Sequence, residues 1–148
     1  MKPAEVLALA RQRASERQLP YAGALMPREA WLLVQQAGAK LIDVRTRAEW
    51  EWVGRVPGSI EIEWNIWPAQ VRNAEFLVQL ADLVEKDAIA MFICRSGVRS
   101  HHAAAAATQV GFAQCFNVLQ GFEGDKDASG HRNSVGGWRL AGLPWGQG

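Results

Sequence analysis

The residue best placed for chemistry is Cys94, which follows an unbroken apolar run and precedes a short turn. The run, residues 88–93, has the length of a buried strand, and a helix is predicted from about Arg99. In an open α/β sheet, ligands bind beyond the carboxyl ends of the strands, where this order of elements places the sulfur. Turn amides and the free N–H groups of a first helical turn favour a thiolate, which is the nucleophilic form of cysteine.

The charges around Cys94 favour an anionic substrate. No acidic residue occurs between Asp87 and Glu123, whereas Arg95 and Arg99 flank the cysteine. Guanidinium groups bind oxyanions through paired donors, so this segment is suited to attract and orient an anion. The balance of 16 basic and 15 acidic side chains over the whole chain conceals this local charge.

Length and composition predict one ordinary globular domain. The chain has 148 residues, of which 49% are hydrophobic and 21% charged. These values argue against disorder, a disulfide scaffold or a broadly basic nucleic-acid surface. No apolar stretch approaches the roughly 18 residues of a membrane span. With only two cysteines, we expect a cytoplasmic protein with no nucleic-acid or membrane partner.

The second cysteine, Cys115, is predicted to have a packing role. It lies in the apolar run 115–119 beside Phe116 and Val118. Free cysteine is among the most buried residue types, so a core position is favoured over a resolving thiol.

The elements that must position Cys94 alternate between strand and helix. Period-two alternation predicts a half-buried strand over residues 59–66, and five consecutive alanines favour a helix over residues 99–110. Helices are also predicted over residues 3–17, 27–36 and 74–85, and strands over residues 41–44, 88–93 and 115–119. This alternation implies βαβ units and a mostly parallel sheet with helices on both faces, an α/β fold.

Three motifs, in order, resemble the rhodanese family of sulfurtransferases. The first is Asp43-Val44-Arg45 with Glu49-Trp50 after it, the second is the turn of residues 54–60, and the third is the loop of residues 94–100. The resemblance covers about residues 41–121. It implies a rhodanese-like three-layer sandwich over residues 23–148, with an N-terminal helical extension, residues 1–22, and a long Gly-rich C-terminal segment.

The resemblance also implies a reaction. Cys94 would take a sulfane sulfur from a small anionic donor such as thiosulfate, become a persulfide, and pass the sulfur to cyanide, a thiol or a protein acceptor. No cofactor or metal is expected. The implied donor-binding residues are Arg95, Ser96, Gly97, Val98 and Arg99. Asp43, Arg45 and Glu49 are expected to support the loop, with a structural ion pair as the preferred interpretation.

Departures from the family pattern leave the acceptor open. Arg55 stands where a histidine is usual, Gly121-Phe122 where two glycines are usual, and the segment after them is longer. A persulfide carrier or a protein-docking module with little turnover is therefore an alternative.

A cysteine phosphatase or arsenate reductase is a further alternative. Those enzymes need an arginine six positions after the cysteine, and here Arg99 is at the fifth position. The tighter loop suits a sulfur atom better than a tetrahedral phosphate or arsenate.

Three other features admit two interpretations. The seven tryptophans include Trp31, Trp64 and Trp138, for which core packing is favoured over a docking surface.

Residues 125–130 resemble the start of a calcium loop, but Gly136 stands where the bidentate Glu belongs, so a surface turn is favoured. His101 and His102 open the helix after the loop, where at least one is expected to be solvated.

Overall fold

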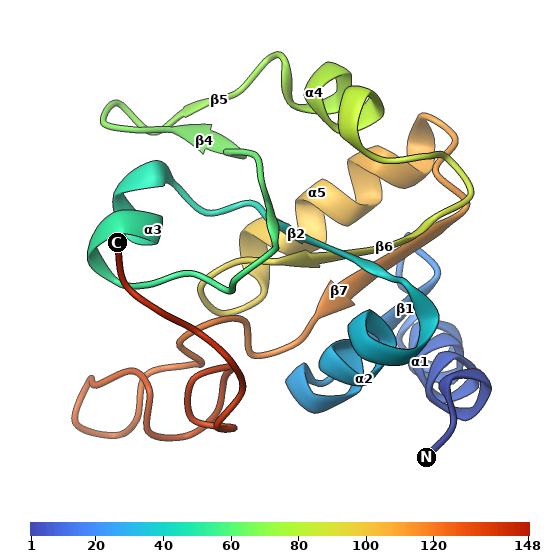
Figure 1. Ribbon diagram of the computed structural model, residues 1–148, viewed down its shortest axis with the longest axis horizontal. Helices are drawn as coiled ribbons and strands as arrows, with labels where there is room; N and C mark the ends of the chain where they lie inside the picture. The colour runs from blue at the N-terminus through green and yellow to red at the C-terminus, as the bar shows by residue number, and fades with distance from the viewer.

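The computed structural model describes residues 1–148 and shows the predicted α/β sandwich. Five parallel strands form one sheet in the order β1-β7-β6-β2-β3, with helices on both faces (Figure 1). The strands are β1 (Gly23–Leu25), β2 (Lys40–Asp43), β3 (Ile60–Glu61), β6 (Ile89–Ile93) and β7 (Gln114–Val118). The helices are α1 (Pro3–Arg17), α2 (Pro27–Ala37), α3 (Arg47–Trp52), α4 (Phe76–Leu83) and α5 (Val98–Gln109).

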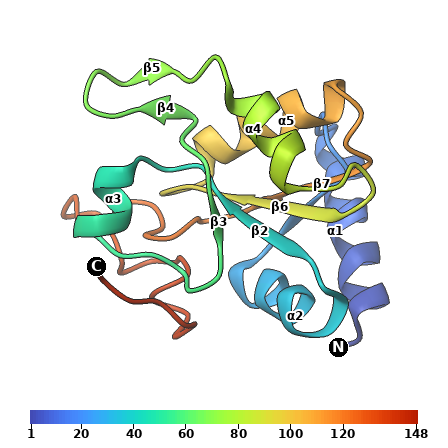
Figure 2. The same ribbon diagram turned by 45° about the horizontal axis from the view of Figure 1, so that its top comes forward.

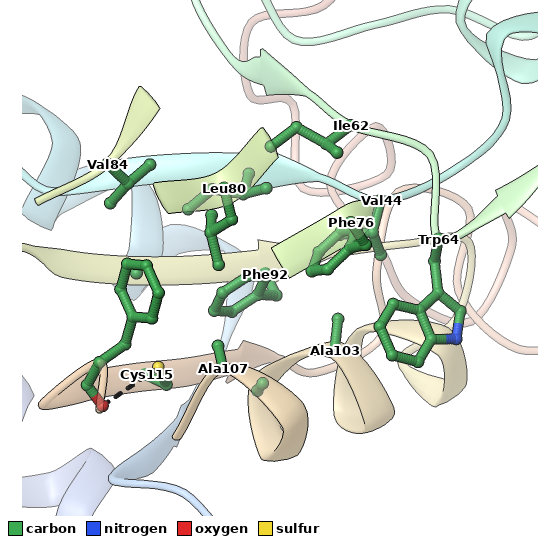
Figure 3. Packing of buried hydrophobic residues seen from close by; sticks show 14 of the residues in the cluster. Val44, Ile62, Trp64, Phe76, Leu80, Val84, Phe92, Ala103, Ala107 and Cys115 are labelled. Atoms are coloured by element: carbon green, nitrogen blue, oxygen red, sulfur yellow. Dashed lines mark hydrogen bonds between the residues drawn. The ribbon is translucent and has the colours of Figure 1, made fainter. Parts of the chain in front are cut away.

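Two hydrophobic clusters fill the two sides of the sheet. On one side, α4 and α5 cover Phe92 and Cys115, and Trp64 packs edge-on against Phe76 (Figure 3). On the other side, α1 and α2 pack with the C-terminal segment, which contributes the fully buried Trp138. The central strand β6 is therefore apolar on both faces, as its unbroken sequence predicts.

The N-terminal helix has the predicted bounds and packs against the rest of the fold. Val6, Ala10 and Ala14 recur every four residues and are buried against the rest of the fold. Arg13, which interrupts the apolar stripe in sequence, pairs with Glu29 at 2.6 Å. The small alanines allow close approach to the sheet, which a stripe of large side chains would not.

The predicted strand over residues 59–66 is wrong for most of its length. Only Ile60–Glu61 joins the sheet, and Asn65–Ile66 forms β4 of a separate antiparallel hairpin with β5 (Val71–Arg72). The neighbouring strand β2 ends at Asp43, and beyond Glu61 the pairing continues only as hydrogen bonds from the Ile62 and Trp64 amides to the Asp43 and Val44 carbonyls. Ile62 and Trp64 are buried by α4 and its surroundings, while Ile66 is exposed.

Strand β1 falls where the sequence suggested only a break between two helices. Its three residues, Gly23–Leu25, are all buried and pair with β7. A three-residue strand carries too short a pattern for its period to be recognised.

No helix in the chain is both long enough and apolar enough to cross a membrane.

Candidate active site

Cys94 lies where β6 ends and the loop to α5 begins. The side chain is buried, and its Sγ accepts a hydrogen bond from the Gly97 amide at 3.2 Å. Gly97 has a φ of 110°, a conformation that disfavours any residue with a Cβ, and it directly precedes α5. The first amides of α5 have no hydrogen-bond partner within the helix. In the loop, the amide of Gly97 is the N–H group that donates to the sulfur.

Ser100, in the first turn of α5, connects the sulfur to strand β7. Its hydroxyl oxygen lies 3.2 Å from Cys94 Sγ and donates to Asn117 Oδ1 at 2.6 Å. Asn117 Nδ2 in turn donates to the Gly97 carbonyl at 3.1 Å. The hydroxyl has one hydrogen, which serves Asn117 while Cys94 is a thiol and can turn to the sulfur when the thiol ionises. The sequence analysis did not single out Asn117.

Arg99 and Glu49 form an ion pair between the loop and α3. Arg99 Nη1 and Nη2 donate to the two Glu49 carboxylate oxygens at 2.7 and 3.0 Å. Burial alone would raise the pKa of Glu49, but the hydrogen bonds and charge of Arg99 outweigh it and lower the pKa to about 2. Of the two arginines expected to bind the donor, Arg99 is thus held by a carboxylate in this structure.

Asp43 and Arg45 form a second pair behind the site. Both side chains are fully buried, and Arg45 Nη2 lies 2.7 Å from Asp43 Oδ2. The same nitrogen donates to the Gly54 carbonyl at 2.7 Å, and the guanidinium lies over the Phe122 ring. The pair thereby connects the end of β2 to the chain that follows α3.

The other loop residues differ in exposure. Arg95 is exposed and takes part in none of the ion pairs, whereas Ser96 is partly buried. Val98 is 64% exposed, so its side chain faces solvent rather than the sulfur. Arg95 is therefore the cation of the loop that is free to meet a ligand.

The start of the C-terminal segment holds the outer side of the loop. Phe122 and Glu123 donate their amides to the carbonyls of Cys94 and Arg95 at 2.8 and 3.0 Å. Gly121 packs so closely that a Cβ would lie 2.6 Å from the Arg95 and Cys94 backbones. These hydrogen bonds to the Cys94 and Arg95 carbonyls fix the outer side of the loop. Sequence reasoning noted Gly121-Phe122 as a departure but missed this role.

An open hollow of about 410 Å³ lies beside Arg95. It lies between α3 and the β4–β5 hairpin, which are neighbours in both views (Figures 1 and 2). Its lining residues are Thr46, Ala48, Glu49, Trp52, Val53, Trp67, Gln70 and Arg95.

The histidines and the second cysteine make no hydrogen bond to the Cys94 sulfur. His101 Nδ1 is 2.7 Å from the Tyr21 hydroxyl, and His102 is exposed. Cys115 is buried in the core, and its burial raises the pKa of the thiol.

The segment that resembles a calcium loop is a surface turn. The Asp127 carboxylate accepts the amides of Ser129 and His131 and the hydroxyl of Ser134. These bonds bind the carboxylate within its own turn. No cluster of three metal-ligating side chains occurs in the chain.

Comparisons with known proteins agree with this architecture. The sequence pattern of the rhodanese-like domain matches residues 26–128. An uncharacterized protein of Rickettsia conorii is 36% identical over 116 residues, 77% of this chain and 88% of that protein. The crystal structure of Rv0390 from M. tuberculosis shares 42% identity with a TM-score of 0.77, covering 86% of this chain and 99% of that one.

A more distant structure shows the fold alone. The polysulfide-sulfur transferase homodimer of Wolinella succinogenes is 17% identical, with a TM-score of 0.57 over 100% of this chain and 95% of its own.

Proposed function

Because the chain belongs to the rhodanese-like domain family, we propose that it is a sulfurtransferase that works through a persulfide on Cys94. The observation that carries this proposal is the environment of Cys94 Sγ, which meets an amide and a hydroxyl at 3.2 Å each. Both groups can stabilise the negative charge of a thiolate or a persulfide. The same cradle would suit the outer sulfur of a persulfide anion.

The reaction consists of two displacements without net redox change. The Cys94 thiolate attacks the sulfane sulfur of thiosulfate, a new S–S bond forms, and sulfite leaves with the electron pair of the broken S–S bond. Cyanide or a thiolate then attacks the outer sulfur of the persulfide, and the Cys94 thiolate leaves. Ping-pong kinetics are expected of such a covalent intermediate.

Arg95 is the residue we assign to donor binding. Its side chain is exposed, follows Cys94 directly in the chain and takes part in none of the ion pairs. Arg99 shares its charge with Glu49, so its contribution is to hold the loop. Asp43, Arg45 and Glu49 act through the loop and α3 rather than on the donor.

A persulfide carrier is the second candidate. Two exposed tryptophans, Trp52 and Trp67, stand beside the loop and favour a surface that receives a partner. Steady turnover with thiosulfate and cyanide supports the enzyme, whereas a single loading without turnover supports the carrier. A cytoplasmic location fits both, because each requires a reduced thiol.

Mass spectrometry of the thiosulfate-treated protein tests the proposal. We expect an adduct with the mass of one sulfur atom on Cys94, which cyanide removes as thiocyanate. Cys94→Ser abolishes both adduct and turnover, while the matched variant Cys115→Ser retains them. An adduct on Cys115 alone contradicts the assignment, and hydrolysis of p-nitrophenyl phosphate would favour the phosphatase alternative.

A further inference from the structure

Two tryptophans beside the active loop are left exposed. Trp52 on α3 is 79% exposed and Trp67, just after β4, is 43% exposed. Trp64 and Trp138, by contrast, are 6% and 0% exposed. Indole rings are highly buried on average, so two exposed rings around one hollow mark a binding surface rather than packing.

The two indoles form walls of the hollow that contains Arg95. At about 410 Å³ it falls within the range of small-molecule sites, which is about 300 to 1,000 Å³. A second hollow of about 330 Å³, lined also by Arg47 and Glu51, shares both tryptophans. The indoles therefore present apolar surface on more than one side, enough to contact an organic group of moderate size.

The charges of the hollow favour an anion at one end. Arg95 has no acidic partner, whereas the lining carboxylate of Glu49 is bound by both Nη atoms of Arg99. Arg95 also follows Cys94 directly in the chain, so the hollow adjoins the loop that carries the sulfur. A ligand that matches the whole site has a charged head and an apolar body.

Thiosulfate can make only the charged contact of this site and not the apolar one. It is small and wholly polar, so it can pair with Arg95 but leaves both indoles in water. An organic group attached to the sulfur-bearing head would cover the indoles and would contribute aromatic or apolar contact.

We propose that Trp52 and Trp67 select an organic sulfane-sulfur donor, a thiosulfonate or persulfide anion with an apolar body, over inorganic thiosulfate. The inference rests on the proposed function. The Cys94 thiolate attacks the terminal sulfur, an S–S bond forms to Cys94, and the bond from that sulfur to the organic group's head breaks. A sulfinate, or a thiolate in the case of a persulfide, leaves with the electron pair.

The test compares two donors that share one head. Benzenethiosulfonate and methanethiosulfonate both present an SO₂S⁻ group, and they differ in the phenyl or methyl body. The measured quantity is the ratio of kcat/KM for the phenyl donor to kcat/KM for the methyl donor, in wild type and variants. Intrinsic reactivity cancels when ratios are compared, and the same ratio with dithiothreitol as nucleophile supplies the protein-free reference.

We expect the wild-type ratio to exceed the dithiothreitol ratio. Trp52→Ala and Trp67→Ala should each lower it by roughly two- to tenfold, the effect of one aromatic contact. Trp52→Phe should restore part of the loss, because it keeps an aromatic face. Arg95→Gln should lower kcat/KM for both donors by the same factor, which leaves the ratio unchanged.

Leu140→Ala is the matched control, since Leu140 is also exposed but does not line the hollow. A wild-type ratio equal to the dithiothreitol ratio overturns the inference, as does a ratio that neither tryptophan variant changes. Both results leave sulfur transfer itself intact. Absence of transfer with these donors and with thiosulfate contradicts the proposed function instead.

Discussion

The guanidinium of Arg99 donates two hydrogen bonds, of 2.7 and 3.0 Å, to the carboxylate of Glu49. The two residues are fifty positions apart in the chain. The two side chains are only about one-fifth exposed. One end of the pair belongs to the helix that follows Cys94, and the other belongs to α3, which also carries Trp52. The pair therefore fixes the active loop against the helix that forms one wall of the adjoining hollow.

Acid should weaken this pair. The folded-state pKa of Glu49, about 2, lies below its ordinary value of 4.5, so its contribution to stability is full above about pH 4.5 and is lost as pH falls towards 2. That contribution is roughly 3 kcal/mol. Glu49→Gln should remove it at neutral pH and flatten the dependence of unfolding free energy on pH between 5 and 3, as urea titrations would measure. Glu51→Gln, exposed on the same helix, should leave the curve unchanged.

Replacing Arg99 by lysine should slow sulfur transfer with every donor alike. Lysine keeps a charge but cannot make the paired hydrogen bonds, so the loop loses its fixed position. We expect kcat to fall roughly ten- to a hundredfold, the effect of a misplaced catalytic group. The rate should fall little further when Glu49→Gln is added. A loss confined to thiosulfate would show that Arg99 binds the donor directly.

Removal of the Ser100 hydroxyl should make the Cys94 thiolate less stable and slow sulfur transfer. Ser100→Ala deletes a hydrogen bond to a charged sulfur, a change worth roughly 1.5 to 3 kcal/mol, or about ten- to a hundredfold in transfer rate. Alkylation of Cys94 by iodoacetamide at neutral pH should slow as well, because the thiolate is the form that reacts. Thr108→Ala is the control, because that hydroxyl lies on the same helix, donates to the Ala104 carbonyl and makes no hydrogen bond to Cys94. Equal effects of the two variants would argue against a role at the sulfur.

Asp43→Asn should strongly destabilise the fold. Arg45 is fully buried, so removing its charged partner leaves an uncompensated guanidinium in the interior. Breaking a buried pair in this way costs about 3 to 5 kcal/mol. Thermal unfolding should show a large fall in Tm, whereas Asp125→Asn on the exposed turn should change it little. A small effect of Asp43→Asn would mean that water reaches Arg45.

Trp138→Ala should destabilise the whole fold and not only the C-terminal segment. Trp138 is fully buried among residues of α1, α2 and the sheet, and its indole Nε1 donates to the Pro144 carbonyl. Truncation of such a ring costs about 3 to 5 kcal/mol, whereas a surface change stays within about 0.5 kcal/mol. Global urea unfolding should therefore shift for Trp138→Ala and not for Leu140→Ala. Loss of structure limited to residues 121–148 would show that the segment is not part of the core.

Elements with long, regular patterns were predictable from sequence. The apolar run of β6 and the alanine stretch of α5 were found within two residues of their bounds. Their local signals agree with their tertiary surroundings. The alternation over residues 59–66 was misleading, because a period of two shows which side chains face the same way but not whether a partner strand is present.

Among the site residues, Cys94 and its loop were predictable because they are adjacent in sequence. Asn117 and Gly121 were not, because they reach the loop from a strand and a turn about twenty residues later. A polar residue within an apolar strand was the one available signal for Asn117. Arg95 and Arg99 look equivalent in sequence, and only the position of Glu49 distinguishes them.

The sequence by itself determined the alternation of the longer strands and helices, the family, and the position of Cys94 between a buried strand and a helix. These properties depend on local periodicity and on contiguous motifs. Only the tertiary structure decided which arginine is neutralised, which tryptophans are buried, and how the C-terminal segment holds the loop. Those outcomes depend on contacts between distant segments, whose geometry is not encoded in any local pattern.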